Sequence, residues 1–198
     1  TSTHRGHGDS IAKGYVAIKQ RTDDELRKRI GTSEAADLSG EALHEAAKAE
    51  HIYRTVAELF GKEDGYCRGR GGGMHIADFS SGHLGANAIV GGSLGIATGA
   101  GLGCRYLENG QLVLCFAGDG AYSNGIVLES LNFGCQAQFT NELAEKPFGM
   151  PVIYVIINNQ YGMTGQQRGE VTGVDFLARR AAGFDMEAMD AEVVNGMD

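Results

Sequence analysis

Two short polar clusters have residue types that could hold a metal ion together with a phosphate group. They are Gly118-Asp119-Gly120 and Asn158-Asn159, and each directly follows a continuous apolar run. Asp119 offers a carboxylate oxygen and Asn159 an amide oxygen, and both Mg²⁺ and Ca²⁺ prefer hard oxygen donors of this kind. Mg²⁺ typically shares its coordination sphere with substrate phosphates. Taken singly, each cluster is more typical of a turn or a loop. Together, and both placed after apolar runs, they favour a binding site.

The two apolar runs, residues 112–117 and 152–157, predict the strands that position these clusters. Continuous apolar runs are expected for parallel strands covered on both faces, and residues 126–135 between them predict the helix of a right-handed β-α-β crossover. Parallel strands bring both carboxyl ends to one edge of the sheet, where ligands of open α/β sheets bind. We expect residues 136–149 to form a surface excursion. A dinucleotide-binding fingerprint is excluded, because Gly118-Asp119-Gly120 lacks the third glycine.

Two further stretches have helical patterns. From Asp23 to about Phe60 the pattern is helical, with Ser39 as a plausible N-cap and Gly61 as a stop signal. Its apolar side chains recur at three- and four-residue steps at Ile52, Val56, Leu59 and Phe60. Residues 92–107 predict a helix built on small residues. Its glycines share one face, which predicts tight packing against a neighbouring element, and they are Gly95, Gly99 and Gly103.

Composition and charge narrow the class of protein. The chain has 198 residues, of which 42% are hydrophobic, 21% are charged and 31 are glycine, and its net charge is −8. This charge argues against binding to nucleic acid or to an anionic membrane surface. The four cysteines form no C-x-x-C pair, so we expect reduced thiols in a cytoplasmic protein. The absence of an initiator Met predicts an internal segment of a longer chain.

The sequence resembles the alpha part of the thiamine diphosphate-dependent decarboxylating component of 2-oxo acid dehydrogenase complexes. Pyruvate, branched-chain and acetoin dehydrogenases belong to this family. The two polar clusters resemble its thiamine diphosphate signature. Further matching segments cover most of the chain, and they are residues 3–8, 12–14, 69–75, 88–92 and 159–163. Residues 74–78 and 84–87 are similar to the acetoin-type branch, and residues 165–170 to long forms in which alpha and beta parts are fused.

The resemblance implies an α/β fold, namely a three-layer thiamine diphosphate-binding fold with a mostly parallel sheet flanked by helices. Residues 1–198 would form the domain that binds the diphosphate and Mg²⁺, with a helical insertion at about residues 22–49. The gap between the two polar clusters is longer than the family's common spacing, which fits an insertion before the second strand. The family's histidine-bearing catalytic loop is expected after Asp198.

The resemblance also assigns roles to individual residues. Asp119 and Asn159 would ligate Mg²⁺ through their side chains and Tyr161 through its backbone carbonyl. Backbone N–H groups of the Gly118-Asp119-Gly120 turn and of Ala121 would line the diphosphate, and Arg5 would pair with it.

The remaining assignments lie outside the two polar clusters. His4 stands where many relatives have a diphosphate-binding Tyr. The backbone of Ala88 would meet the aminopyrimidine, and Val90 would be the apolar wedge that bends the cofactor. His7 is a candidate catalytic residue or a structural loop residue. We interpret the other histidines as structural, surface or packing residues, and they are His44, His51, His75 and His83. Arg68 and Arg70 suggest either an anion site or a solvated loop.

The function implied by the resemblance is oxidative decarboxylation of a 2-oxo acid, most plausibly pyruvate, with transfer of the acyl group to a lipoyl arm of an acyltransferase component. The cofactors would be thiamine diphosphate and Mg²⁺. A beta-type subunit or domain would complete the active site, in a heterotetramer or a fused chain, and would supply the acidic residue that activates the aminopyrimidine. Two alternatives stay open: cleavage of acetoin by the same cofactor site, and a non-catalytic diphosphate-binding module.

Overall fold

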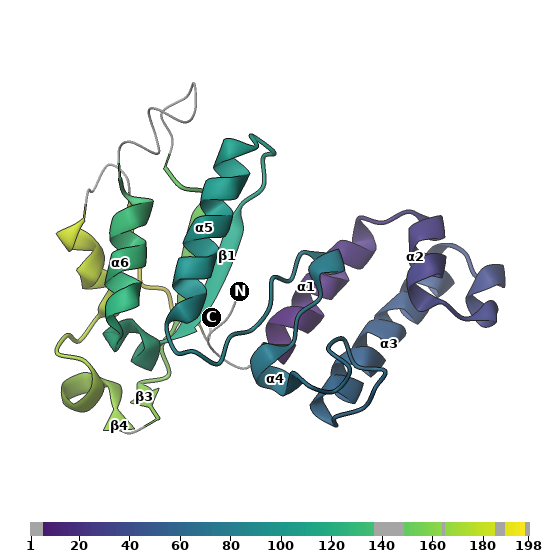
Figure 1. The fold of residues 1–198 in the computed structure, drawn as a ribbon, viewed down its shortest axis with the longest axis horizontal. Coiled ribbons are helices and arrows are strands. Elements are labelled where there is room, and N and C mark those ends of the chain that lie inside the picture. Colours follow the sequence, from purple (N-terminus) through teal and green to yellow (C-terminus); the bar gives the residue numbers. More distant parts are fainter. Residues whose placement is uncertain (1–5, 137–148, 164, 185–188, 197–198) are drawn as a thin grey trace. The chain divides into compact units, whose positions relative to one another are not determined.

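The computed structural model of the chain describes residues 6–136, 149–163, 165–184 and 189–196 (Figure 1). The chain folds into two compact units, an N-terminal unit, His4–Ala88, and a C-terminal unit, Ile89–Asp198. Each unit has a hydrophobic core of its own. None of the helices in the described ranges is long and apolar enough to cross a membrane.

The C-terminal unit is built on two parallel strands, β1 (Val113–Gly118) and β2 (Val152–Ile157). Helices α5 (Gly92–Tyr106) and α6 (Gly125–Gly134) pack against each other, and α5 also contacts both strands. The predicted parallel pairing and the helix between the strands are therefore confirmed. The observed boundaries of these three elements lie within one residue of the predicted ones. The unit is an α/β arrangement with a small parallel sheet.

The sheet has one covered face. Val113, Cys115 and Ala117 of β1 point into the core with α5 and α6, whereas Leu114 is 44% exposed. Its register partner Ile153 on β2 is 52% exposed. The expectation of strands covered on both faces is therefore met on one face only in the described part of the chain.

The glycines of α5 pack differently from the prediction. A Cβ built on Gly99 or Gly103 would meet no described atom within 4 Å, and one on Gly95 would make ordinary contacts at 3.7 Å. The close approach is at Gly101 instead, where an added Cβ would overlap the side chain of Val152 on β2. The prediction of tight packing along the face of Gly95, Gly99 and Gly103 is therefore wrong within the described residues.

The N-terminal unit is helical. Helix α1 (His7–Lys19) packs on α3 (Gly40–Leu59), and α2 (Asp23–Ile30) packs on α3 as well. A short helix, α4 (Gly72–His75), begins near the end of the glycine-rich loop, which we define as residues 65–73. The core of this unit combines side chains from the three long helices, and it consists of Ile18, Leu26, Leu43 and Ala47.

Local signals explain where these helices begin and end. The side chain of Thr22 accepts a hydrogen bond from the Glu25 backbone N–H, and Glu25 bonds back to the backbone of Thr22, which forms a capping box at the start of α2. Ser39 occupies the N-cap of α3 as predicted, although its side chain makes no capping hydrogen bond. Gly61, with φ of 68°, follows the end of α3 as predicted.

Near the C-terminal end of α3, the apolar positions that the sequence pattern predicts to be buried are exposed, and largely polar positions are buried instead. Ile52, Val56 and Phe60, whose spacing is typical of a buried helix face, are exposed. The buried positions of the same turns are His51, Thr55, Ala57 and Glu58, three of which are polar. This helix therefore buries polar side chains, each of which needs a hydrogen-bonding partner.

One set of partners forms a buried polar network that links three helices. The carboxylate of Asp78 forms an ion pair with Arg29 of α2 and accepts hydrogen bonds from the hydroxyls of Ser80 and Ser81. Arg29 also donates to the hydroxyl of Tyr66 at 2.8 Å. The same hydroxyl is hydrogen-bonded to His51 Nδ1 of α3, and His51 Nε2 lies 2.9 Å from the backbone oxygen of Ser10 in α1.

The Asp78 carboxylate makes stability depend on acid pH. Burial tends to raise its pKa, but the hydrogen bonds from Ser80, Ser81 and Arg29 outweigh burial and lower the pKa from 3.8 to about 2. A carboxyl group whose pKa is lower in the folded chain stabilises the fold above its unfolded pKa. That contribution is lost as the pH falls from about 4 to about 2.

We therefore expect Asp78→Asn to lower the free energy of unfolding at pH 7 by about 3 kcal/mol, because it leaves the buried Arg29 charge without its partner. The variant should also lose less stability than the parent between pH 4 and pH 2. Denaturant unfolding at a series of pH values measures both effects. The control is Asp24→Asn, which removes an exposed ion pair with Arg27 on the same helix and should change little. Parallel pH profiles for the parent and Asp78→Asn would contradict the assignment.

Candidate functional site

The two polar clusters lie together at the carboxyl edge of the sheet. The 3₁₀ helix η3 (Asp119–Ser123) starts where β1 ends, and the loop from Asn158 to the short strand β3 (Tyr161–Gly162) follows β2. The last paired residues of the two strands are Gly118 and Ile157, so both chains leave the sheet side by side. A Cβ on Gly120 would stand 3.4 Å from Gly162 Cα. The turn after β1 and the strand β3 are therefore in van der Waals contact.

Asp119 has a buried and unpartnered carboxylate oxygen. The residue is 2% exposed, and its Oδ2 atom has no hydrogen-bond partner in the described part of the chain. A buried charge is costly unless it is paired or coordinates a metal ion. This arrangement fits a cation, and the oxygen donors available at this edge are of the kind that Mg²⁺ prefers.

The loop after β2 is held by its own asparagine side chains. Asn159 Oδ1 accepts from the Tyr161 backbone N–H at 3.0 Å, and Asn158 Oδ1 accepts from the Gln160 N–H at 3.0 Å. Gln160 between them has a φ of 68°. An amide oxygen has a second lone pair, so Asn159 retains acceptor capacity for a metal ion while it shapes the turn.

Sequence reasoning missed Asn124, which connects Val90 to the start of α6. Its Oδ1 caps the helix by accepting from the Ile126 N–H at 3.2 Å, and its Nδ2 donates to the Val90 backbone oxygen at 2.9 Å. The bond from Asn124 holds the Val90 backbone in place. Val90 is 47% exposed, so its side chain is accessible to a ligand. An Asn directly before an apolar helical run was the available signal.

The other predicted site residues are distributed between the two units. His4 and Arg5 lie outside the described residues. His7 and Ala88 belong to the N-terminal unit, where His7 is half-buried at the start of α1 and Ala88 is exposed. The buried Nδ1 of His7 has no hydrogen-bond partner within the described ranges. His83 of the same unit is buried too, and burial lowers its pKa to about 4, so it is neutral at pH 7.

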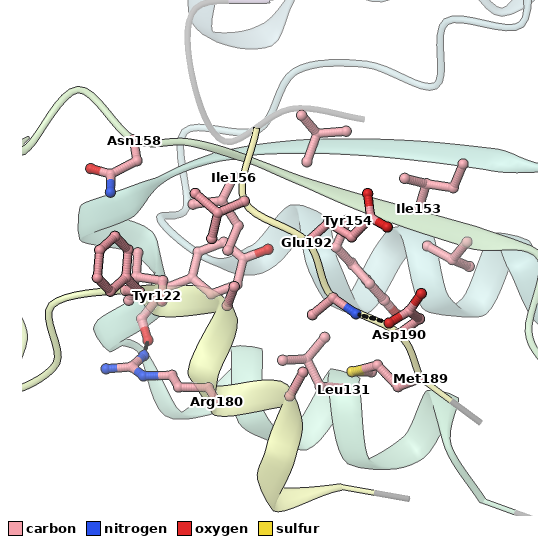
Figure 2. Close-up of a pocket in the computed structure, with 18 of the residues that line it drawn as sticks. Tyr122, Leu131, Ile153, Tyr154, Ile156, Asn158, Arg180, Met189, Asp190 and Glu192 are labelled. Carbon is pink, nitrogen blue, oxygen red and sulfur yellow. Dashed lines mark hydrogen bonds between the residues drawn. The ribbon is translucent and has the colours of Figure 1, made fainter. Parts of the chain in front are cut away.

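A cavity of about 500 Å³ adjoins the candidate site alongside β2 (Figure 2). Side chains from β2, the end of α6, the 3₁₀ helix η5 (Leu177–Gly183) and residues 189–194 line it. Figure 2 shows Arg180 of η5 directed toward Tyr122, whose backbone oxygen it hydrogen-bonds. Among the described residues, Tyr122 and Asn158 border both the cavity and the polar clusters, but none of the residues predicted to bind the cofactor lines the cavity.

Comparison with known proteins identifies a family that fits these observations. Residues 41–198 match the family profile of the dehydrogenase E1 component. The chain is 35% identical over its whole length to the alpha subunit of acetoin:2,6-dichlorophenolindophenol oxidoreductase from Bacillus subtilis, and it covers 44% of that protein. It is also 34% identical, over its whole length, to the protein of the same name from Cupriavidus necator, again covering 44%.

A pyruvate dehydrogenase is similar as well. The E1 component subunit alpha of pyruvate dehydrogenase from Rickettsia typhi is 32% identical over 178 residues, which are 87% of this chain and 51% of that protein. The chain therefore spans about half the length, or less, of these three relatives. With a family match over residues 41–198 and with similarity along the whole chain, the protein belongs to the dehydrogenase E1 component family.

Proposed function

We propose that the chain is the diphosphate- and Mg²⁺-binding part of the alpha component of a thiamine diphosphate-dependent 2-oxo acid dehydrogenase, with pyruvate as the 2-oxo acid. The observation that carries this proposal is the buried Oδ2 of Asp119, which has no hydrogen-bond partner among the described residues, at the carboxyl edge of two parallel strands. Membership of the dehydrogenase E1 component family supports it. The three-layer arrangement of the complete fold and a cytoplasmic location belong to the same proposal.

In this proposal the C-terminal unit holds the metal ion. Asp119 supplies the charged ligand, Asn159 a neutral amide oxygen and Tyr161 its backbone carbonyl. The backbone N–H groups of Gly120 and Ala121, at the turn after β1, face the diphosphate. The residues of this turn can approach an anion closely because Gly118 and Gly120 carry no side chains.

Bound thiamine diphosphate supplies the nucleophilic carbon and the electron sink that decarboxylation of a 2-oxo acid requires. The protein's own residues position it: Val90 provides an apolar contact, His4 and Arg5 bind the diphosphate, and Ala88 contacts the aminopyrimidine through its backbone. His7 is the candidate for a proton-handling role near the substrate. A beta-type subunit or domain would complete the site, and a lipoyl group of an acyltransferase component would accept the acyl group.

Acetoin is the second candidate substrate. The relatives from Bacillus subtilis and Cupriavidus necator, which match the whole chain, are both named for acetoin, whereas the pyruvate dehydrogenase from Rickettsia typhi matches 87% of it. In this proposal either reaction uses thiamine diphosphate held by the same residues, so the cofactor contacts do not distinguish the two substrates. A direct comparison of substrates has to decide between them.

If Asp119 binds the metal ion, a substitution there should weaken cofactor binding and should also stabilise the enzyme that lacks metal and cofactor. In the full-length enzyme, Asp119→Asn should weaken Mg²⁺-dependent binding of thiamine diphosphate by about 10- to 100-fold, because it replaces a charged ligand by a neutral one. Without metal and cofactor the same variant should unfold at a higher temperature than the parent, because it removes an unpaired buried charge.

Titration calorimetry and thermal unfolding measure these two effects. Asn159→Ala should weaken binding less than the change at Asp119. The control is Asp175→Asn, which removes an exposed carboxylate paired with Arg168 at 2.8 Å and should leave both quantities unchanged. Unchanged cofactor affinity in Asp119→Asn would remove Asp119 from the site.

The substrate proposal predicts that the full-length enzyme, supplied with its beta-type part, releases CO₂ from pyruvate and reduces an artificial electron acceptor. Pyruvate, branched 2-oxo acids and acetoin should be compared at equal concentrations, with Asp119→Asn at a cofactor concentration below its raised Kd as the low-activity control. Activity with acetoin, and with none of the 2-oxo acids, would replace the pyruvate proposal by the acetoin alternative.

A further inference from the structure

Glu58 has a carboxylate enclosed by backbone N–H groups of the glycine-rich loop. The residue stands near the C-terminal end of α3 and is 1% exposed. Its Oε2 accepts from the N–H groups of Cys67 at 2.7 Å and Gly69 at 2.9 Å, and its Oε1 accepts from those of Gly71 at 2.6 Å and Gly72 at 3.0 Å. One side chain thus satisfies four donors of a loop that forms no regular structure before α4.

The backbone of this loop is shaped to point its N–H groups inward. Gly69 and Gly72 have φ values of 68° and 55°, and Arg68 adopts 56° despite its side chain. Successive N–H groups in left-handed and right-handed conformations form a concave anion-binding nest. At Gly65 a Cβ would stand 2.6 Å from Glu58 Cα, so the start of the loop lies directly against α3.

The nest is filled by the chain's own anion. Burial alone would raise the pKa of the Glu58 carboxyl, but the four N–H donors outweigh burial and hold its pKa below the ordinary value, so it is charged at pH 7. The Arg68 and Arg70 side chains are exposed, and Arg68 pairs with Glu63 at 3.8 Å. The loop therefore does not offer this nest to an external phosphate, and of the two predictions for Arg68 and Arg70 the structure favours the solvated loop.

The glycine-rich loop in turn contacts the start of α1 within the same unit. The backbone oxygen of Gly73 accepts from the Gly6 N–H at 2.7 Å. A Cβ on Gly73 would lie 3.0 Å from His7 Nδ1, so the loop and His7 are in close contact. Gly6 and His7 directly follow His4 and Arg5 in the sequence.

We infer that Glu58 is a positioning residue for the start of α1: it fixes the glycine-rich loop, and the loop fixes Gly6 and His7. This inference rests on the proposed function, because it takes His4 and Arg5, which directly precede Gly6 in the sequence, to bind the diphosphate. A small misplacement of cofactor-binding residues is costly, since binding and orientation depend on fractions of an ångström.

Glu58→Gln tests the inference in the full-length enzyme. The amide has one acceptor oxygen, and its NH₂ group would face two of the four N–H donors, so the nest should open. We expect the Kd for thiamine diphosphate to rise by about tenfold or more, and kcat at saturating cofactor to fall as well, because the loop also positions His7. The control is Glu63→Gln, a nearby exposed glutamate that should leave both values unchanged.

Hydrogen exchange gives a readout that does not depend on bound cofactor. In Glu58→Gln the amides of residues 67–72 should exchange faster, and so should the Gly6 amide that bonds Gly73. If the loop amides lose protection while Gly6 and the Kd are unchanged, Glu58 serves only the loop, and the inference is overturned. If the parent enzyme binds no thiamine diphosphate, the proposed function fails. If the parent binds it and Glu58→Gln binds it equally well, only this inference fails.

Gly73→Ala provides a second test if Glu58→Gln folds poorly. The added methyl group pushes on His7 without removing any bond to Glu58, and it should also raise the Kd by about tenfold. In a double-mutant cycle the two changes should raise the Kd by less than the product of their separate effects, because both act through the same contact. Independent, multiplicative effects would contradict a path from Glu58 through the loop to His7.

Discussion

The parallel pairing of β1 with β2 is the constraint on which the candidate site depends. Because the strands are in register up to Gly118 and Ile157, the residues that follow them emerge at the same edge of the sheet. An antiparallel pair would have placed Asp119 and Asn159 at opposite ends. The helices serve this pairing: α5 and α6 cover one face of the strands, and Asn124 ties the start of α6 to Val90.

Buried carboxylates show how each unit is organised. Among the described residues the buried acids are Glu58, Asp78 and Asp119. Glu58 has four backbone donors, and Asp78 has Arg29 and two hydroxyls, so both charges are satisfied within the N-terminal unit. Asp119 differs, because one of its oxygens is buried without a partner in the described residues. The two partnered charges stabilise the framework of the N-terminal unit, whereas the third, which has an oxygen without a partner among the described residues, is the one on which the proposed metal site rests.

The elements that sequence analysis predicted best are those whose pattern reflects burial directly. The strands after residue 112 and after Pro151 are continuous apolar runs, and their parallel pairing follows from the helix between them. Helix α1 was not predicted, because its first turns contain Gly, His and Asp rather than an apolar stripe. The buried face of α3 was missed for a related reason: His51 and Glu58 are polar, and only the folded loop around them shows that their bonds are satisfied.

For the site, the sequence predicted the two clusters, but it could not show that Asp119 Oδ2 has no partner among the described residues, because that depends on the neighbours in space. It also missed Asn124, whose contact with Val90 joins residues 34 positions apart in the chain.

The enclosure of Glu58 has a consequence for mutational tolerance. The contacts that define the glycine-rich loop are made by backbone N–H groups, so the side chains at Arg68 and Arg70 carry none of the four bonds. The loop's shape is encoded instead by an acid on α3 and by glycines such as Gly69, where an added Cβ would overlap the backbone of Gly61. Substitutions at the exposed Arg70 should therefore be accepted, whereas Glu58, which lies outside the loop, and the loop's own glycines should tolerate little change.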